Sequence, residues 1–256
     1  MSVIWIVSFI TSSILTFQLP LSLSLRDDAS FENFYESQNS AAVKQIKNST
    51  AAKSSDGSIY LWGSETSGKT HLLEAACHQA TKLNRVVVYI PLKHASEFKI
   101  SMLENLETCG LICIDDVDLI AGQSEWEQAI FYLYNRAYET GAQLVFSASK
   151  NVKECNFTLP DLVSRLGWGF VFHIHVLADE EKAAALQMRA KLRGFDLPDN
   201  VVRYLLRRLP RDMNALFGLL DELDKASLTA QRKLTVPFIK QWFNERENIL
   251  QDTPLL

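Results

Sequence analysis

The sequence predicts an α/β fold, a parallel five-stranded sheet covered by helices and followed by a small C-terminal domain of helices alone. Five short apolar runs alternate with amphipathic helical patterns, at residues 59–62, 86–90, 111–114, 144–146 and 171–176. Their continuous apolar character is typical of parallel strands that are buried on both faces. After residue 178 the pattern is helical only. We therefore expect an α/β domain over residues 29–177 and a helical domain over residues 178–256.

The composition is typical of a soluble globular protein. The 256 residues are 47% hydrophobic and 22% charged, with a net charge of −4 and a pI near 5.8. Because the chain has no overall basic field, direct sequence-specific DNA binding is disfavoured. The four cysteines show no C-x-x-C spacing, which favours reduced thiols and a cytoplasmic location.

Residues 1–28 form an N-terminal extension. The first 17 residues are largely apolar and uncharged, but a bilayer span takes about 20 residues. They also lack the basic start and the A-x-A site of a secretory signal. The two remaining interpretations are a membrane-associating tail and an extension from a start codon assigned too early. The second is favoured, because the rest of the chain has cytosolic character.

The leucines of residues 18–25 alternate with other residues, and Pro20 and the serines discourage a helix. A short extended peptide of this kind can bind in a groove on a partner. It can also be an edge strand or a linker, and from the residues alone these interpretations are favoured. An aromatic cluster that includes Phe31 and Phe34 then precedes a predicted helix at residues 40–51. These aromatic residues either join the core or line an adenine ring.

The strand at residues 59–62 runs into the pattern G-x-x-x-x-G-K-T, from Gly63 to Thr70, and a helical pattern follows. In this context the loop turns its backbone N–H groups toward a phosphate, Lys69 reaches the outer phosphates, and the Thr70 hydroxyl can bind Mg²⁺. The helix adds the positive end of its dipole. Further candidate nucleotide-binding residues around this loop are Phe34, Thr66, Ser67, Gly68 and His71.

The strand at residues 111–114 ends in Asp115 and Asp116, after a predicted short helix at residues 95–106. At the carboxyl end of a parallel strand beside a phosphate loop, Asp115 can hold Mg²⁺ through water and Asp116 can position an attacking water. The alternative is an ordinary cap between a strand and a turn. The accompanying phosphate loop favours the metal site.

The remaining elements continue this organisation. A helix at residues 126–139 precedes the strand at residues 144–146, which small polar residues follow at the strand end where open parallel sheets meet their ligands. A short helix is predicted to begin at Pro160, and the fifth strand follows it. The helices predicted for the C-terminal domain lie at residues 179–192, 198–209, 212–226 and 236–243.

This order of elements resembles the AAA+ family of ATPases, in which a phosphate-loop sheet is followed by a helical lid. Four motifs resemble the bacterial replication initiator DnaA, namely Phe31-Glu32-Asn33-Phe34, residues 68–73, Ile114-Asp115-Asp116 and residues 164–169. The lid motifs at residues 192–198 and 226–235 are similar to the Hda branch, the DnaA-related regulators that inactivate the initiator. The short interval between residues 90 and 111, and the lack of room for DNA-binding helices after the lid, also favour the Hda branch.

The resemblance implies that Arg165 acts in trans. In this interpretation Arg165 enters the ATP site of DnaA as an arginine finger, a group worth about 10³ to 10⁵ in rate, and the chain's own ADP or ATP is structural. The alternative is a surface ion pair of little effect. The Hda branch also carries a peptide that binds the DNA polymerase sliding clamp, and the residues here that match it are Gln18, Leu19, Leu21 and Leu23.

Two positions depart from the initiator pattern. Ser149 stands where DnaA has an acidic sensor residue, and Asn214 stands where its lid presents a sensor arginine. Both remain candidate nucleotide contacts, and together with the short side chain of Asp116 they predict weak hydrolysis by the chain itself. The AAA+ interface is also compatible with a homodimer. The alternative functions are an autonomous AAA+ ATPase such as a helicase loader, and a membrane-tethered scaffold that uses residues 1–17.

Overall fold

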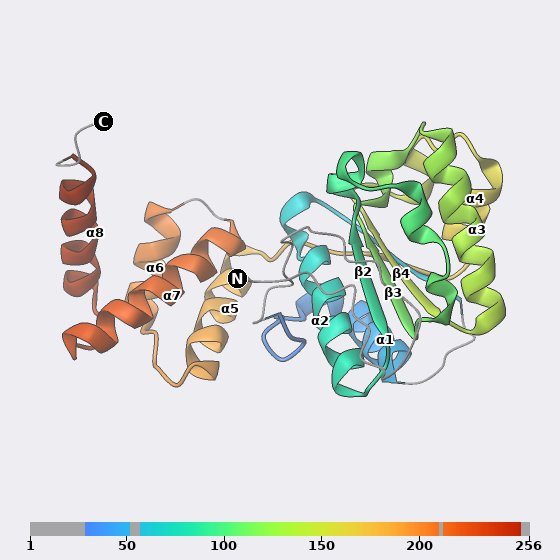
Figure 1. Cartoon of the computed structure of the whole chain (residues 1–256). Coiled ribbons are helices and arrows are strands. Elements are labelled where there is room, and N and C mark those ends of the chain that lie inside the picture. The colour runs from blue at the N-terminus through green and yellow to red at the C-terminus, as the bar shows by residue number, and fades with distance from the viewer. Residues whose placement is uncertain (1–28, 52–56, 210–211, 252–256) are drawn as a thin grey trace. The chain divides into compact units, whose positions relative to one another are not determined.

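The computed structural model describes residues 29–51, 57–209 and 212–251 (Figure 1). The chain divides into two compact units between Val176 and Leu177. The predicted clamp-binding residues 18–23 lie outside the described residues. In the part of the chain that the structure describes, no helix is both long and apolar enough to cross a membrane.

The first unit is built on the five-stranded parallel sheet that the sequence predicts. The strand order is β2-β3-β4-β1-β5, and each neighbouring pair is parallel. The strands are β1 Ile59–Trp62, β2 Val87–Pro91, β3 Leu111–Asp115, β4 Gln143–Ala148 and β5 Phe170–His173. Every residue of β3 and β4 is buried, which explains why the middle of each strand, residues 111–114 and 144–146, is continuously apolar in sequence.

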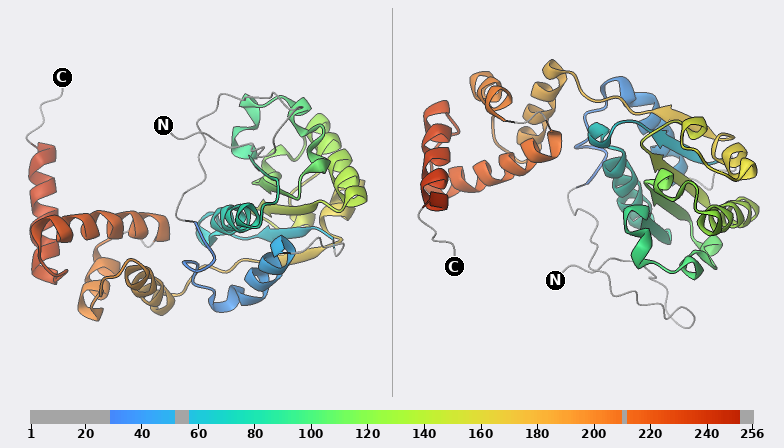
Figure 2. Two further views of the ribbon diagram at one scale, coloured as in Figure 1. Left: turned by 60° about the horizontal axis from the view of Figure 1, so that its bottom comes forward. Right: turned by 90° about the horizontal axis from the view of Figure 1, so that it is seen from above.

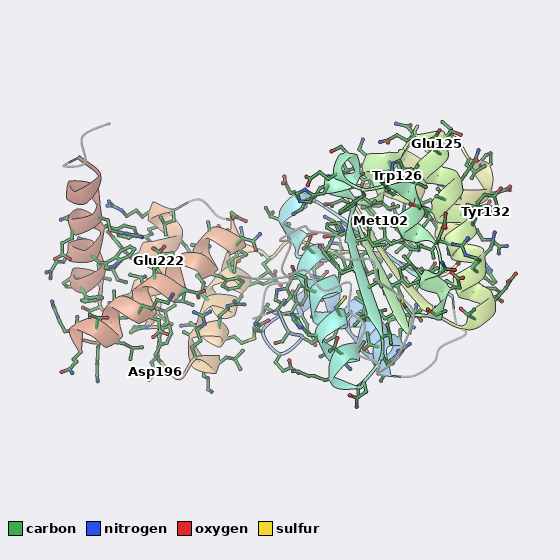
Figure 3. All side chains as sticks on the ribbon, viewed as in Figure 1. Met102, Glu125, Trp126, Tyr132, Asp196 and Glu222 are labelled. Atoms are coloured by element: carbon green, nitrogen blue, oxygen red, sulfur yellow. The ribbon has the colours of Figure 1, made fainter. Side chains whose placement is uncertain are left out.

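Helices cover both faces of the sheet (Figure 2). Helices α1 Ser40–Ala51 and α2 Lys69–Lys82 pack on one face, and α3 Ser124–Thr140 and α4 Pro160–Leu166 pack on the other. Each face of the sheet has its own hydrophobic core. Successive residues of β1 point into different cores, Tyr60 into the one under α3 and Leu61 into the one under α2. Helix α3 is amphipathic as predicted, with Trp126 7% exposed and Tyr132 57% exposed (Figure 3).

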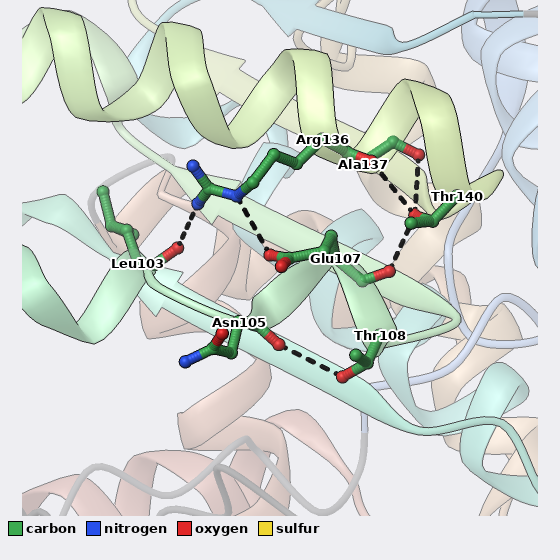
Figure 4. A network of polar contacts seen from close by, with 7 residues as sticks. All are labelled: Leu103, Asn105, Glu107, Thr108, Arg136, Ala137 and Thr140. Atoms are coloured by element: carbon green, nitrogen blue, oxygen red, sulfur yellow. Dashed lines mark hydrogen bonds and ion pairs between the residues drawn. The ribbon is translucent and has the colours of Figure 1, made fainter.

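The prediction of a helix at residues 95–106 is wrong. The structure has three short 3₁₀ turns between β2 and β3, at Leu92–Glu97, Ile100–Leu103 and Leu106–Thr108. The backbone is extended at Phe98 and left-handed at Asn105, with φ 61°, so a continuous helix cannot form. Side chains of α3 hold the segment in place (Figure 4). Arg136 donates to the Leu103 carbonyl at 3.0 Å and to Glu107 at 3.1 Å, and the Thr140 hydroxyl donates to the Glu107 carbonyl at 2.7 Å.

Strand β5 is shorter than the predicted run of residues 171–176. It ends at His173, although the Ile174 N–H still donates to the Trp62 carbonyl at 2.7 Å. The backbone of His175 instead pairs with a side chain, since its N–H donates to Asn39 Oδ1 at 2.8 Å and its carbonyl accepts from Asn39 Nδ2 at 3.0 Å. The strand stops because β1, the neighbour with which it pairs, turns into the phosphate loop at Gly63.

The second unit is helical, as the sequence predicts. Its described helices are α5 Asp179–Leu192, α6 Asp199–Arg208, α7 Met213–Ala230 and α8 Val236–Gln251. Apolar residues from all four form one core, which includes Leu186, Val201, Leu220 and Ile239. Helix α7 begins after Asp212, whose carboxylate accepts from the N–H groups of Asn214 and Ala215. Both α7 and α8 extend beyond their predicted ends, because apolar spacing alone does not mark the last polar turns of a helix.

Candidate nucleotide-binding site

Close packing requires both glycines of the phosphate loop. Gly63 lies directly after β1, and a Cβ there would be 2.4 Å from the Ile174 carbonyl oxygen. Gly68 has φ +93°, and a Cβ there would be 2.8 Å from Cε2 of Phe34. A side chain at position 63 would therefore change the path of the loop, and one at position 68 would displace Phe34 or the loop, which supports the sequence interpretation of a backbone cradle rather than a simple turn.

The side chain of Lys69 lies within the loop. It is 4% exposed, and its Nζ donates to the carbonyl oxygens of Gly63 and Ser64, each at 2.8 Å. Burial lowers the pKa of Lys69, while the carboxylates of Asp116 and Asp115 oppose that shift. The hydroxyl of Ser67 also donates to the Ser64 carbonyl, at 2.8 Å. These contacts hold the loop in one compact conformation.

The segment before α1 lies against the loop. The ring of Phe34 packs on Gly68 and its centroid is 5.6 Å from that of His71. His71 Nε2 is 2.9 Å from the Ser30 carbonyl oxygen. Three residues that the sequence analysis selected, Phe34, Gly68 and His71, are therefore neighbours. Thr66 is exposed on the short turn Glu65–Ser67.

Asp115 is the centre of a cluster of hydroxyl groups. It is 2% exposed and accepts from the Thr70 hydroxyl at 2.8 Å, from the Tyr89 hydroxyl at 2.7 Å, and from the Ser147 hydroxyl. The structure thus brings together Thr70 and Asp115, the two predicted Mg²⁺ ligands. Tyr89 and Ser147 were not among the predicted site residues. The small polar run that follows the predicted strand at residues 144–146 was the available signal for Ser147, which the structure places in β4, whereas nothing distinguished Tyr89 from the other residues of its strand.

Asp116 follows with an unusual backbone conformation. Its φ is 56°, and its N–H donates to the Ser147 hydroxyl oxygen at 2.9 Å. Burial and the neighbouring Asp115 raise the pKa of Asp116 to about 6, and Lys69 opposes this shift. Ser147 therefore links the two aspartates, since its hydroxyl donates to the Asp115 carboxylate and accepts from the Asp116 N–H.

Ser149 and Asn214 make contacts of their own, each within its unit. Ser149 binds Asp118, to which both its N–H, at 3.1 Å, and its hydroxyl donate. Asn214 lies in the first turn of α7 in the second unit, where its N–H donates to Asp212 at 3.3 Å. The predicted clamp-binding residues, Gln18, Leu19, Leu21 and Leu23, lie outside the described residues.

The residues present fit a nucleotide with a divalent cation. The loop is closely packed at both glycines, a lysine is buried in it, and Thr70 and Asp115 offer adjacent oxygens. Among the described residues, no three His, Cys, Asp or Glu side chains gather into a metal site. A cation bound here would therefore take most of its ligands from phosphate and water, as Mg²⁺ does in phosphate-loop proteins.

Arg165 lies in the last turn of α4 and is half-buried. Its guanidinium carbon is 5.8 Å from the ring centroid of Tyr134 and 5.9 Å from that of Trp168. Helix α4 contributes Leu162 and Leu166 to the core on the α3 side of the sheet, while α2 packs on the other side. Arg165 is therefore carried by the sheet face opposite the helix that begins at the phosphate loop.

The fold and this site define a phosphate-loop protein of the AAA+ type. Residues 25–173 match the model of the bacterial DnaA ATPase domain, and residues 179–243 match the model of the Hda lid domain. The first match covers more than half of the chain. The chain therefore belongs to the DnaA-related AAA+ family and carries a lid of the Hda type.

Solved structures of DnaA have the same fold. Domain III of the Thermotoga maritima replication initiation protein DnaA aligns with a TM-score of 0.67 and 19% identity, over 84% of this chain and 95% of that one. AMPPCP-bound DnaA from Aquifex aeolicus aligns with a TM-score of 0.63 and 23% identity, over 77% of this chain and 66% of that one. A replication initiator DnaA bound to AMPPCP and single-stranded DNA aligns with a TM-score of 0.65 and 22% identity, over 89% and 72%.

Proposed function

We propose that the chain regulates the initiation of DNA replication by stimulating ATP hydrolysis on DnaA through Arg165. The placement of this residue carries the proposal, because α4 holds Arg165 on the sheet face opposite the helix that begins at the chain's own phosphate loop. An Hda-type lid on a DnaA-type ATPase domain supports it. Residues 18–23 tether the chain to the sliding clamp, and the chain acts in the cytoplasm.

The guanidinium of Arg165 suits a site that holds phosphate. Arginine stays charged at all physiological pH values, and its planar fork binds phosphate oxygens in a bidentate manner. The rings of Tyr134 and Trp168 lie beside the group and restrict its rotamers before a partner binds. Less conformational entropy is then lost when the side chain enters a neighbouring protein's site.

The chain's own loop holds ADP or ATP as a structural ligand. Backbone N–H groups of residues 63–70 bind the phosphates. When the nucleotide binds, Lys69 replaces its hydrogen bonds to two loop carbonyls with hydrogen bonds to phosphate oxygens. Thr70 and Asp115 are the residues that would hold Mg²⁺, which would neutralise phosphate charge when bound. The nucleotide-bound DnaA structures of the same fold support this assignment.

Hydrolysis of that nucleotide by the chain itself is weak in this proposal. Ser149, at the position of the initiator's acidic sensor, is bound to Asp118. Asn214 supplies no cation where the initiator has an arginine.

The decisive experiment mixes the chain with ATP-bound DnaA and DNA-loaded clamp and follows ATP hydrolysis. Wild type should stimulate hydrolysis, and Arg165→Ala should lose about 1,000-fold or more of that stimulation, within the range of arginine fingers. Arg165→Lys should recover only a small part, because lysine keeps the charge but loses the fork. Arg207→Ala, at an exposed lid arginine, is the charge-matched control and should behave as wild type.

Two results would contradict this function. Absence of stimulation by wild type, or equal stimulation by Arg165→Ala, would reject the action in trans. Rapid ATP turnover by the purified chain alone, abolished by Asp116→Asn, would instead favour an autonomous ATPase such as a helicase loader. The observation that favours an autonomous ATPase is the complete phosphate loop with its Thr70–Asp115 contact.

A further inference from the structure

A carboxylate is buried beneath the helix that carries Arg165. Glu127 lies in the first turn of α3 and is 0% exposed. Its side chain accepts from the Gly122 N–H at 2.7 Å, from the Thr158 N–H at 3.1 and 2.9 Å, from the Thr158 hydroxyl at 3.0 Å, and from the Leu159 N–H at 2.7 Å. A buried charge is tolerated when donors surround it in this way.

The donors to Glu127 come from two separate segments. Gly122 belongs to the turn that leads into α3, and Thr158 and Leu159 directly precede α4. Burial alone would raise the pKa of Glu127, but the N–H groups of Thr158, Gly122 and Leu159 outweigh burial and lower it. The side chain therefore stays ionised at neutral pH and joins the start of α3 to the start of α4.

Leu159 links Glu127 to α4, because its N–H donates to Glu127 and its carbonyl bonds to the first turn of the helix. It is the residue before the helix, and its carbonyl accepts from the N–H groups of Leu162 and Val163, at 3.1 and 3.2 Å. Helix α4 has only seven residues, and a helix of this length has little stability of its own. Its position therefore depends on tertiary contacts, which are the buried Leu162 and Leu166 and the anchor at its first residue.

We propose that Glu127 is a positioning residue for Arg165. It fixes the first turn of α4, and Arg165 stands in the last turn of the same short helix, so the direction of the arginine follows from the anchor. This inference rests on the proposed function of Arg165. Catalytic groups lose much of their effect when they are displaced by about 1 Å. A loosened α4 therefore lowers the maximal stimulation of DnaA more than it weakens binding to DnaA.

The test uses the full chain with Glu127→Gln, a change that keeps the shape and places an NH₂ group against the N–H donors. Glu125→Gln is the matched control, because Glu125 lies in the same turn of α3 and is exposed (Figure 3). Hydrogen exchange is measured first. Amides of residues 158–166 should exchange about tenfold faster or more in Glu127→Gln. Those of α2 and of the lid should not change, and Glu125→Gln should match wild type.

Stimulation of DnaA is measured next, as a function of chain concentration. Glu127→Gln should lower the maximal rate about tenfold and leave the half-maximal concentration within about twofold of wild type, which a loss of folded protein would not do. The double variant Glu127→Gln with Arg165→Ala should equal Arg165→Ala alone, because the two residues act as one unit.

The outcomes separate the two proposals. If Arg165→Ala keeps full stimulation, the proposed function fails, and hydrogen exchange still decides whether Glu127 anchors α4. If Arg165→Ala loses stimulation but Glu127→Gln does not, or if α4 exchange is unchanged, the positioning role is wrong. If Glu127→Gln does not fold, Thr158→Val removes a single contact of the carboxylate. Thr158→Val should also speed the exchange of α4 amides and lower the maximal stimulation, by smaller factors than Glu127→Gln. If neither effect is seen, the proposal is overturned.

Discussion

At the scale of single residues, the site depends on which side chains the backbone brings within reach of Asp115. The register of β3 and β4 pairs Ile114 with Phe146, so the next residues, Asp115 and Ser147, lie side by side at the carboxyl end of the sheet. The sequence indicated a polar end for β4 but not which of its residues meets the acid. Side chains alternate between the faces of a strand, and only the register decides the partner.

The first prediction concerns Gly68. Gly68→Ala should lower the free energy of unfolding by about 1 to 3 kcal/mol, the cost of a strained backbone, because φ is +93° and the new Cβ would be 2.8 Å from Phe34. It should also weaken ADP binding about tenfold or more, about 1.4 kcal/mol, since Phe34 or the loop must move. Urea unfolding and isothermal titration measure the two effects.

Gly141→Ala is the control for Gly68→Ala. Gly141 also has a positive φ, +74°, but a Cβ there meets nothing within 4 Å. This variant should therefore carry the backbone strain and leave ADP affinity unchanged. Equal ADP affinity for Gly68→Ala and wild type would contradict the tight packing of Phe34 on the loop.

At the scale of elements, the sequence predicted those that have a strong hydrophobic period. Helix α1, strand β1 and helix α5 have the predicted bounds. The segment between β2 and β3 was predicted as a helix but forms 3₁₀ turns. The spacing of its apolar residues is compatible with both structures and does not distinguish them. The choice is made by α3, through the bonds of Arg136 and Thr140.

The second prediction tests this choice. Arg136→Met keeps the aliphatic part of the side chain but removes the bonds to the Leu103 carbonyl and to Glu107. It should lower the free energy of unfolding by about 1 to 2 kcal/mol, because the buried Leu103 carbonyl loses its charged donor while the part-exposed ion pair contributes less. Urea unfolding measures this effect, and hydrogen exchange of residues 92–110 locates it.

A double-mutant cycle with Glu107→Gln separates the two bonds of Arg136. The coupling between residues 136 and 107 should be about 0.5 kcal/mol or less, because the ion pair is partly exposed. If Arg136→Met unfolds at the same urea concentration as wild type, side chains of α3 do not determine the path of this segment.

At the scale of the whole molecule, the chain consists of two units with separate cores and an N-terminal extension. In the sheet unit, α2, which begins at the phosphate loop, and α4, which carries Arg165, pack on opposite faces, and the lid has its own apolar core. This division is compatible with the proposed function, in which the bound nucleotide is structural and the effect is exerted on a partner. The extension adds the proposed tether to the sliding clamp.

The third prediction concerns that tether. The double variant Gln18→Ala with Leu19→Ala should bind the clamp at least about tenfold more weakly, because a groove-bound peptide depends on a few anchoring side chains. ADP affinity should remain that of wild type. Surface plasmon resonance with immobilised clamp measures the effect, and Ser22→Ala is the control within the same peptide. Unchanged clamp binding by the double variant would leave residues 18–23 as a linker.

The sequence by itself determined the parallel sheet, the phosphate loop and the helical second unit, because each has a local signature in hydrophobic period or in glycine and lysine spacing. Only the tertiary structure decided which hydroxyls surround Asp115, how α4 is anchored by Glu127, and which face carries Arg165. These features join residues that are far apart in the chain, such as Tyr89 and Asp115 or Glu127 and Leu159. Contacts of this kind follow from strand register and helix packing, which no local pattern of residues specifies.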